Sequence, residues 1–283
     1  MLDLIKSVIF GIIEGVTEWL PISSTGHLIL AEEFLSFKNV SEGFWSMYEV
    51  VIQLGAILAV VVIFWNQIFP FTNKPELAMG KSGILAHIKQ EQFWLWVNIL
   101  VACIPAAVIG ILFNDLFEAL FYKYYVVAIA LIVFGIAFIV IENWNKTRTP
   151  RVTDVNQLTM KAVLIIGAFQ LIAAIFPGTS RSGATIIGAL LIGVSRKVAA
   201  EFTFYLAIPV MFGASLLKIV KFGLAFTAME AAILLVGMIV SFVVSIIVIK
   251  FLMDYIKKHD FKVFGYYRIA LGVVVLLYFF LTK

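Results

Sequence analysis

Residues able to do chemistry are concentrated in two short segments of this sequence. The first segment, residues 14–27, combines carboxylates, hydroxyls and an imidazole: Glu14, Glu18, Ser23, Ser24, Thr25 and His27. The second segment, residues 177–185, combines hydroxyls and glycines with one arginine: Gly178, Thr179, Ser180, Arg181, Ser182, Gly183 and Thr185. Guanidinium and hydroxyl groups bind phosphate oxygens, and carboxylates bind divalent cations or accept protons. Together the two segments indicate chemistry on a phosphate group.

Glu14 and Glu18 are spaced to act as a pair. Four residues apart, they lie on the same face of a helix. Two carboxylates so close repel each other unless a divalent cation, an arginine or shared protons lie between them. We expect both to belong to a site, as catalytic residues or as ligands of a cation. The alternative is that they face water at the edge of a membrane.

The hydroxyls Ser23, Ser24 and Thr25 follow Pro21, where one helix stops and another begins. Their simplest role is to cap the second helix. The same position suits phosphate, because a helix N-terminus offers free N–H groups and the positive end of the helix dipole. His27 lies one turn further, and it is either an acid, base or nucleophile or a hydrogen-bonded packing residue.

Arg181 is the most informative residue of the second segment. Its guanidinium is always charged, and its fork binds phosphate oxygens in pairs. Gly178 and Gly183 let the backbone approach a ligand closely. The alternative role for Arg181 is a structural ion pair with Glu14 or Glu18. Either role brings the two segments into contact, so that a diphosphate could lie between them.

The composition sets the environment in which these residues act. Of the 283 residues, 63% are hydrophobic and 13% are charged, and the mean hydropathy is +1.06. An ordinary soluble domain has about 25% charged residues. These values exclude a cytosolic enzyme, a disordered chain and a nucleic-acid-binding protein. The net charge of +4 is typical of basic membrane loops, and the lone Cys103 excludes an intrachain disulfide framework.

The chain is therefore predicted to be an all-α, polytopic integral membrane protein, with residues 1–283 in a single membrane domain. Six stretches are apolar and long enough to cross a membrane: 50–73, 92–114, 124–141, 197–217, 222–249 and 263–282. Two other regions, 1–36 and 158–195, each contain two apolar halves of roughly 15 residues around a polar break. We expect these regions to be re-entrant helical hairpins; the alternative is two ordinary kinked spans.

The two halves of the chain resemble each other. A shift of 156 residues places Gly11 on Gly167, Glu14 on Gln170, Pro21 on Pro177, Ser24 on Ser180 and Thr25 on Arg181. Each half, about 1–142 and 158–283, then consists of a broken hairpin followed by three spans. An odd number of spans inverts the second half relative to the first, as in many inverted-repeat membrane proteins whose broken helices form a site near the midplane.

The basic residues predict an orientation. With the N-terminus outside, 13 Lys and Arg residues fall in inside loops and six in outside segments, so the positive-inside rule favours both termini outside. Among the remaining charges, Glu201 is expected to pair with Lys197. Arg268 and Glu230 lie near the ends of spans and are expected to snorkel to the interface.

The two polar breaks resemble the motifs of a known family. Residues 14–27, which read Glu-Gly-Val-Thr-Glu-Trp-Leu-Pro-Ile-Ser-Ser-Thr-Gly-His, and residues 177–185, which read Pro-Gly-Thr-Ser-Arg-Ser-Gly-Ala-Thr, are similar to the two motifs of the bacterial undecaprenyl-diphosphatases, known as bacitracin-resistance proteins. Length and span pattern agree over essentially the whole chain.

The resemblance implies a phosphatase of the bacterial cytoplasmic membrane that acts at its outer face. It would hydrolyse undecaprenyl diphosphate to undecaprenyl phosphate and inorganic phosphate, recycling the lipid carrier for peptidoglycan and envelope polymers and conferring bacitracin resistance. It implies a divalent cation, Mg²⁺ or Ca²⁺, which Glu14 and Glu18 would hold unless one of them is the base. Arg181 and the hydroxyls and glycines of both segments would bind the phosphates.

Several alternatives stay open at this point. The nucleophile is Ser24, His27 or water, and His27 could instead protonate the leaving group. The expected partners are the lipid substrate and membrane lipids, with no nucleic acid, and a homodimer is left open. The rival function is a transporter or flippase of the polyprenyl phosphate carrier, because paired broken hairpins are also a transporter plan.

Overall fold

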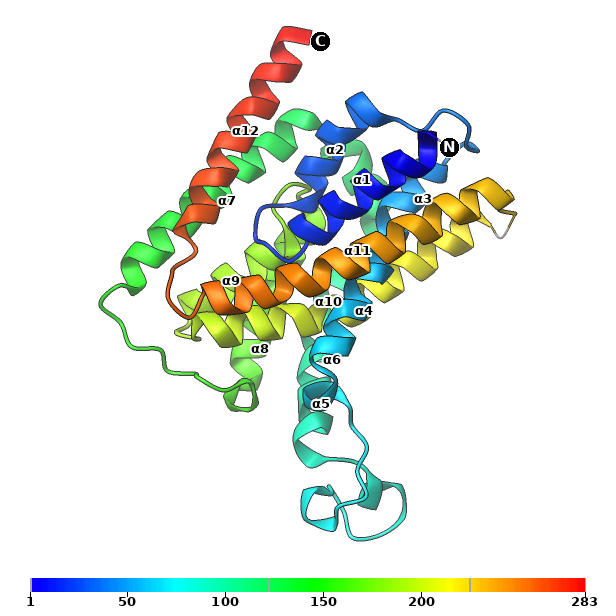
Figure 1. The fold of residues 1–283 in the computed structure, drawn as a ribbon. Helices are drawn as coiled ribbons and strands as arrows, with labels where there is room; N and C mark the ends of the chain where they lie inside the picture. The colour runs from blue at the N-terminus through cyan, green and yellow to red at the C-terminus, as the bar shows by residue number, and fades with distance from the viewer. Residues whose placement is uncertain (1, 122, 224, 283) are drawn as a thin grey trace.

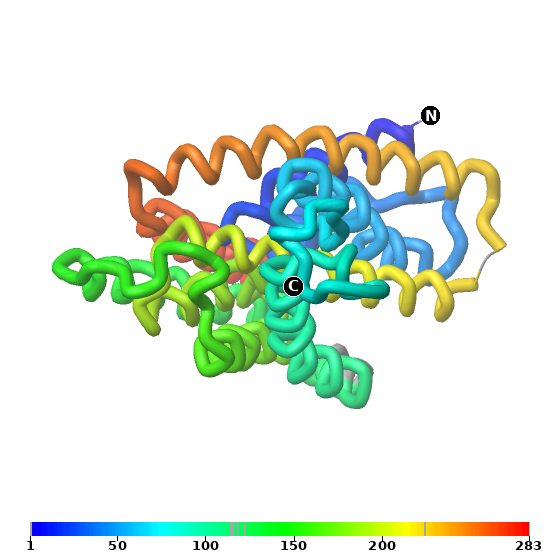
Figure 2. The backbone as a smooth tube through the Cα atoms, turned by 90° about the horizontal axis from the view of Figure 1, so that it is seen from below, coloured from blue at the N-terminus to red at the C-terminus, as the bar shows by residue number. Residues whose placement is uncertain are grey.

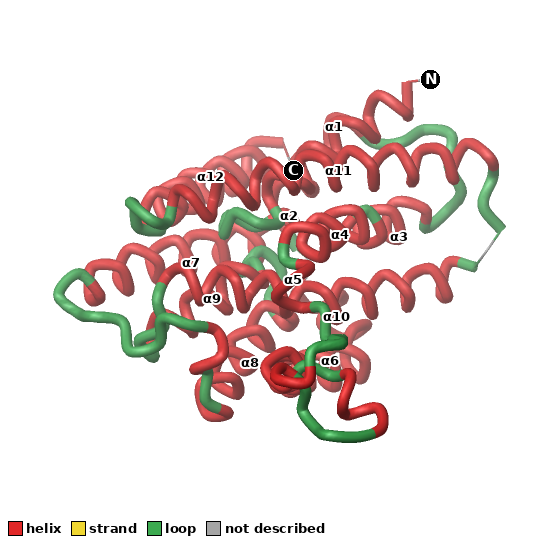
Figure 3. The backbone as a smooth tube through the Cα atoms, turned by 60° about the horizontal axis from the view of Figure 1, so that its bottom comes forward, coloured by secondary structure: helices red, strands yellow, loops and turns green. Residues whose placement is uncertain are grey.

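The computed structural model describes residues 2–121, 123–223 and 225–282, apart from the side chains of residues 114, 115 and 118. The described residues form helices and loops, with three isolated bridges and no strand (Figure 3). The α-helices are α1 (Leu2–Thr17), α2 (Ser24–Leu35), α3 (Phe44–Val51), α4 (Gln53–Ile63), α5 (Trp65–Ile68), α6 (Gln90–Phe121), α7 (Tyr124–Asn145), α8 (Met160–Ile175), α9 (Arg181–Leu191), α10 (Arg196–Phe222), α11 (Ala228–Tyr255) and α12 (Lys262–Thr282). The short 3₁₀ helices are η1 (Pro75–Leu77), η2 (Gly83–His87) and η3 (Val155–Gln157).

Six helical segments of the described chain are long and apolar enough to cross a membrane, which confirms the predicted number. They are Phe44–Ile63, Gln90–Phe113, Tyr124–Asn145, Arg196–Phe222, Ala228–Tyr255 and Lys262–Thr282. Many large apolar side chains on them point outward, as expected where lipid rather than protein covers the helix. The fold is therefore that of an all-α, multi-pass membrane protein.

The boundaries of the first span differ from the prediction of 50–73. The segment begins six residues earlier, at Phe44, and the helical part ends at Ile68. The prediction begins after Glu49 because a charged residue breaks the apolar run there. Glu49 instead lies inside the segment, on the wall of a cavity described below. Residues 69–89 leave the helical body as a projecting arm (Figure 1).

Within the described residues, each half of the chain has two short helices followed by three segments long enough to cross a membrane. The short pairs are α1 with α2 and α8 with α9, and they have 11 to 16 residues each. A crossing helix needs about 20 residues, so none of the four is long enough to cross alone. Two points stay predictions. They are that each pair enters and leaves by the same side of the membrane, and that one half is inverted relative to the other.

The halves are interleaved by packing. Helix α1 packs along α11, whereas α8 packs along α6, and α7 packs along α12 (Figures 1 and 2). Glycines make the first two contacts close. A Cβ at Gly11 would lie 2.7 Å from the carbonyl oxygen of Gly237, and one at Gly167 would lie 2.6 Å from that of Ala102. Helices α1 and α8, the first of each short pair, are thus each held by a long helix from the other half of the chain.

Two expectations about charged residues near helix ends have different outcomes. Lys197 and Glu201 form the predicted ion pair, at 3.7 Å. The prediction that Glu230 snorkels is wrong, because its side chain is fully buried. Its carboxylate accepts hydrogen bonds from the backbone N–H of Thr227 and from that of Ser41, so it caps α11 and ties it to the loop before α3.

Candidate active site

The two polar breaks form turns of the same conformation. Ser23 has φ 73° and ψ 101°, and Ser180 has φ 67° and ψ 120°; they are the two non-glycine residues with positive φ in the described chain. Each is the N-cap of the next helix, and each side chain accepts a hydrogen bond from the backbone N–H three residues on. The caps pair Ser23 with Ser180, so the register at the turns is one residue off the predicted shift of 156.

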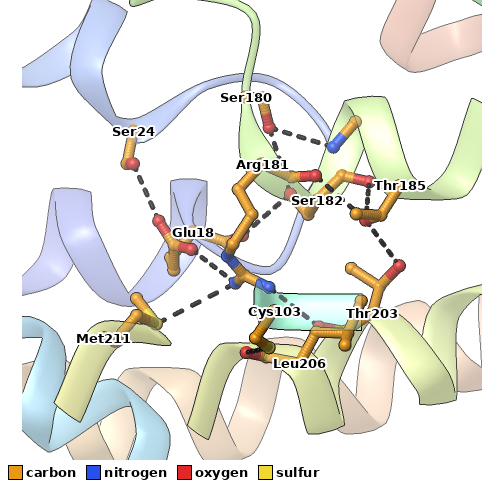
Figure 4. Close-up of polar contacts among 11 residues, drawn as sticks. Glu18, Ser24, Cys103, Ser180, Arg181, Ser182, Thr185, Thr203, Leu206 and Met211 are labelled. Carbon is orange, nitrogen blue, oxygen red and sulfur yellow. Dashed lines mark hydrogen bonds and ion pairs between the residues drawn. The ribbon is translucent and has the colours of Figure 1, made fainter. Parts of the chain in front are cut away.

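Glu18 lies at the centre where the two turns meet (Figure 4). Ser24 Oγ donates a hydrogen bond of 2.8 Å to Glu18 Oε2, and Arg181 Nη2 lies 2.8 Å from Glu18 Oε1. Arg181 Nη1 also donates to the backbone oxygen of Thr203 at 2.8 Å, which fixes the plane of the guanidinium. The predicted contact between the two segments is confirmed, and the residues that make it come from both halves of the chain.

The hydroxyls of the second turn form a network beside this centre. Ser182 Oγ donates to the backbone oxygen of Glu18 at 3.1 Å and lies 3.1 Å from Ser180 Oγ. Thr185 Oγ1 lies 2.8 Å from Thr203 Oγ1. Thr203 was not among the predicted residues, and it braces both Arg181 and Thr185 from α10.

Glu14 lies one helical turn before Glu18 and is completely buried. Within the described chain neither of its carboxylate oxygens has a hydrogen-bond partner, which is costly for a buried polar group. The described residues contain no cluster of three or more His, Cys, Asp and Glu that could hold a metal ion. Glu14 could still hold a cation whose remaining ligands are substrate oxygens and water, as is usual for Mg²⁺.

The hydrogen bonds of His27 go to residues other than Glu18 and Arg181. Its Nδ1 lies 2.8 Å from the backbone oxygen of Ser23, and its Nε2 lies 2.7 Å from the hydroxyl of Tyr267 on α12. The imidazole is stacked on the Tyr267 ring, with an angle of 4° between the planes. Both ring nitrogens are therefore engaged away from Glu18, as in the packing role considered for His27.

A cavity of about 260 Å³ opens beside the first turn. Ser24 and Thr25 line it, together with three polar residues that the sequence analysis did not propose as site residues: Glu49, Gln53 and Lys218. Lys218 Nζ donates to Ser46 Oγ at 2.8 Å. One helix face carries Ser46, Glu49 and Gln53, because they are spaced three and four residues apart. This spacing is the sequence signal from which they could have been proposed as site residues. Ser24 links the cavity to Glu18.

Arg268 was also missed as a site residue, and the expectation that it snorkels is wrong. Its side chain is 0% exposed. It donates to the backbone oxygens of Pro21 at 3.2 Å, Gly178 at 3.0 Å and Thr179 at 2.7 Å. Pro21 precedes the first cap and the other two precede the second, so a single guanidinium holds both turns. Gly178 and Thr179 thereby contribute carbonyls to Arg268, and the buried Thr179 hydroxyl has no partner among the described residues.

The site is thus a buried carboxylate bound by a hydroxyl and a guanidinium, beside a polar cavity in a bundle of membrane-spanning helices. A hydroxyl hydrogen-bonded to a carboxylate is the arrangement of a nucleophile and its base. A guanidinium next to them can bind a phosphate. The fold and site define a multi-pass membrane protein equipped for phosphoryl chemistry.

Comparison with known proteins agrees with this description. The family model "Bacitracin resistance protein BacA" matches residues 7–274. The chain is 61% identical over 279 residues to an undecaprenyl-diphosphatase of Desulfitobacterium hafniense, covering 99% of this chain and 97% of that protein. It is 59% identical to one of Acetivibrio thermocellus over the whole of both chains, and 52% identical to one of Streptococcus mutans over 98% and 96%. The chain belongs to the BacA family.

Proposed function

We infer that this protein hydrolyses undecaprenyl diphosphate to undecaprenyl phosphate and inorganic phosphate. It would thereby return the lipid carrier to peptidoglycan and envelope polymer synthesis and confer bacitracin resistance. The proposal rests on one observation: Ser24 and Arg181 bind the two oxygens of the Glu18 carboxylate, and Ser24 also lines a cavity. Full-length identity to proteins named undecaprenyl-diphosphatase supports the choice of substrate.

Ser24 is our candidate nucleophile. Glu18 would accept the Ser24 hydroxyl proton as Oγ attacks the terminal phosphorus. The phosphoanhydride bond would break, undecaprenyl phosphate would leave with the bond's electron pair, and water would then release phosphate from Ser24. The hydrogen bond between Ser24 and Glu18 favours Ser24 over His27, whose ring nitrogens face Ser23 and Tyr267.

Arg181 has two roles in this scheme. Without substrate it neutralises Glu18, at 2.8 Å. A bound phosphate would compete for the same guanidinium, because phosphate accepts its paired N–H groups. The exchange would free Glu18 to act as a base at the moment when charge on the phosphate needs stabilising. Ser23, Thr25, Ser180, Ser182, Gly183 and Thr185 would complete or support the phosphate-binding turns.

A divalent cation, Mg²⁺ or Ca²⁺, fits the free carboxylate of Glu14, whose oxygens have no partner among the described residues. Glu14 would hold it together with substrate oxygens and water, while Glu18 acts as the base. When bound, the cation would neutralise charge on the diphosphate. Ser24, Glu18 and Arg181 would perform the same roles of attack, proton acceptance and phosphate binding.

The location follows from the same proposal. The chain would lie in the bacterial cytoplasmic membrane, with the site at the outer face and both termini outside, as the distribution of basic residues favours. The terminal residues Met1 and Lys283 lie outside the described residues.

The test is phosphate release from undecaprenyl diphosphate by the purified full-length protein in detergent. The assay would be run with Mg²⁺, with Ca²⁺ and with EDTA, and with Ser24→Ala. Ser82→Ala, an exposed serine on the projecting arm, is the matched control. We expect cation-dependent release that Ser24→Ala lowers about 100-fold and Ser82→Ala retains. A folded protein that binds the lipid without releasing phosphate would instead favour the transporter.

A further inference from the structure

A second, larger cavity lies at the other end of α10. Its volume is about 1230 Å³, and its walls come from the C-terminal ends of α7, α9 and α11, the loop after α7 and the N-terminal ends of α8 and α10. Arg196 of α10 lines it, whereas Lys218 of the same helix lines the first cavity. Lys218 follows Arg196 by 22 positions, a separation of about 33 Å along a helix and close to the roughly 30 Å thickness of a bilayer core. The two cavities therefore open toward opposite faces of the membrane.

The lining of this cavity is strongly basic. Six cations contribute to it: Lys146, Arg148, Arg151, Lys161, Arg196 and Lys197. Glu142, the one carboxylate among the described lining residues, is already bound to Arg196, at 2.9 Å between Nε and Oε1, and to the backbone N–H of Phe261 at 3.0 Å. Lys197 is paired with Glu201.

Four of the cations are available for a ligand. Lys146, Arg148, Arg151 and Lys161 are exposed and form no ion pair within the described chain. Two of the four are arginines, whose forks bind phosphate oxygens in pairs. The first turns of α8 and α10 lie at the same cavity and add the positive ends of two helix dipoles.

Part of the cavity lining is apolar. Ile165, Leu190, Leu191, Ile192 and Ile256 line it beside the basic residues. A small, strongly hydrated anion would use only the basic wall. An amphiphile with a phosphate head and a hydrocarbon chain would use both.

We propose that this cavity is a second phosphate-binding site, on the membrane face opposite the hydrolytic site. Its ligand is a phosphate group bound by Arg148, Arg151, Lys146 and Lys161, carried either by a membrane lipid or by free inorganic phosphate. The site takes no part in the hydrolysis at Ser24, and it would remain if that activity were assigned differently. The competing explanation is a general attraction of basic loops to anionic lipid. That attraction would depend on total charge, whereas a site depends on the cavity residues in particular.

The test measures binding by isothermal titration to the purified full-length protein in dodecyl maltoside. The probes are dodecyl phosphate and inorganic phosphate, and every variant carries Arg181→Ala so that the hydrolytic site contributes little. The cavity variant adds Arg148→Gln and Arg151→Gln. The control variant adds Lys74→Gln and Lys81→Gln, two exposed lysines of the projecting arm, and loses the same charge.

We expect the cavity variant to bind dodecyl phosphate at least about ten-fold more weakly than the Arg181→Ala parent, because charge-assisted hydrogen bonds are lost. The control variant should match the parent. Dodecyl phosphate binding about ten-fold or more tightly than inorganic phosphate would identify a lipid ligand, and similar affinities would identify free phosphate. Equal weakening in both variants, or in neither, would overturn the proposal.

Two further measurements guard against misfolding. In an otherwise native chain, Arg148→Gln with Arg151→Gln should retain the native rate of phosphate release, because neither residue belongs to the hydrolytic site. The Arg148 guanidinium lies 3.5 Å from the ring centroid of Trp144. Bound phosphate should draw Arg148 away and change Trp144 emission, and Trp144→Phe should remove that change. A probe that binds with no Trp144 response contradicts the assignment to this cavity.

Discussion

The two hairpin turns have nearly the same backbone but carry different chemistry. In each, a serine with positive φ caps the second helix. The residue after the cap is Ser24 in the first turn and Arg181 in the second. These two equivalent residues bind the two oxygens of one carboxylate, Glu18. A repeated scaffold has thus placed a hydroxyl and a guanidinium on opposite sides of the same acidic group.

Arg268 relates the two turns in the same way. It binds the carbonyls of Pro21 and Gly178, each two residues before its cap. A duplicated backbone presents two equivalent acceptors, and one buried cation from α12 holds both. What differs between the turns is the residue after each cap, so substitutions there should alter chemistry, whereas substitutions at the cap or at Arg268 should alter positioning.

The largest effect is expected at the second turn. Arg181→Ala should lower kcat for phosphate release by about 100- to 1000-fold, as loss of a donor that stabilises transition-state charge typically does. Arg181→Lys keeps the charge but not the fork and should recover only part of the loss. Steady-state phosphate release measures both. Arg151→Lys, an exposed arginine outside the hydrolytic site, is the control, and equal activity of Arg181→Lys and the native protein would contradict the paired binding of phosphate.

A smaller but still large effect is expected at the equivalent position of the first turn. Ser24→Ala should lower kcat about 100-fold, because it removes the proposed nucleophile while Glu18 and Arg181 remain. Ser180→Ala should lower stability by about 1 kcal/mol through its lost cap and lower kcat less than ten-fold. Phosphate release and thermal unfolding in detergent give the two values. A greater loss of kcat in Ser180→Ala would mean that the cap, rather than the residue after it, carries the chemistry.

Arg268→Lys should have an intermediate effect. Lysine keeps the charge, but its single ammonium cannot reach the carbonyls of both turns in the guanidinium geometry. We expect a loss of about 2 kcal/mol in stability from unsatisfied buried carbonyls, and about a ten-fold loss of kcat with a smaller change in KM. The control is Arg148→Lys, the same exchange at an exposed arginine that follows the C-terminal end of α7. It shows how much an arginine-to-lysine exchange by itself changes stability and kcat. Native kcat in a destabilised Arg268→Lys protein would reduce Arg268 to a structural role.

The sequence was sufficient for the features that depend on local composition. Six apolar runs predicted six crossing helices because a bilayer demands length and hydrophobicity. Opposite charges in two polar breaks predicted that Glu18 or Glu14 would meet Arg181. The rule of charge-free runs misplaced the first span, since Glu49 lies within it.

Features that depend on distant partners could not be read in this way. Arg268 lies close to a helix end in sequence, but its burial depends on two turns 90 and 247 residues away. His27 turns to Tyr267, 240 residues further along the chain. Lys218 reaches the first cavity only because α10 packs along α3. In each case the tertiary packing, rather than the neighbouring residues, sets the role.

The smallest expected effect is at the caps themselves, and it tests how alike the turns are. A non-glycine residue in this positive-φ conformation costs about 1–3 kcal/mol. Ser23→Gly and Ser180→Gly would each remove this cost and so raise stability. Each would also lower stability, because the cap is lost and the unfolded chain gains entropy. Ser23 accepts a long hydrogen bond of 3.4 Å, whereas Ser180 accepts one of 3.1 Å and also contacts Ser182. Ser23→Gly should therefore stabilise the protein by about 0.5–1 kcal/mol, and Ser180→Gly should change its stability by less. Thermal unfolding of the two variants side by side measures this difference, and greater stabilisation by Ser180→Gly would show that the second turn, not the first, is the more strained.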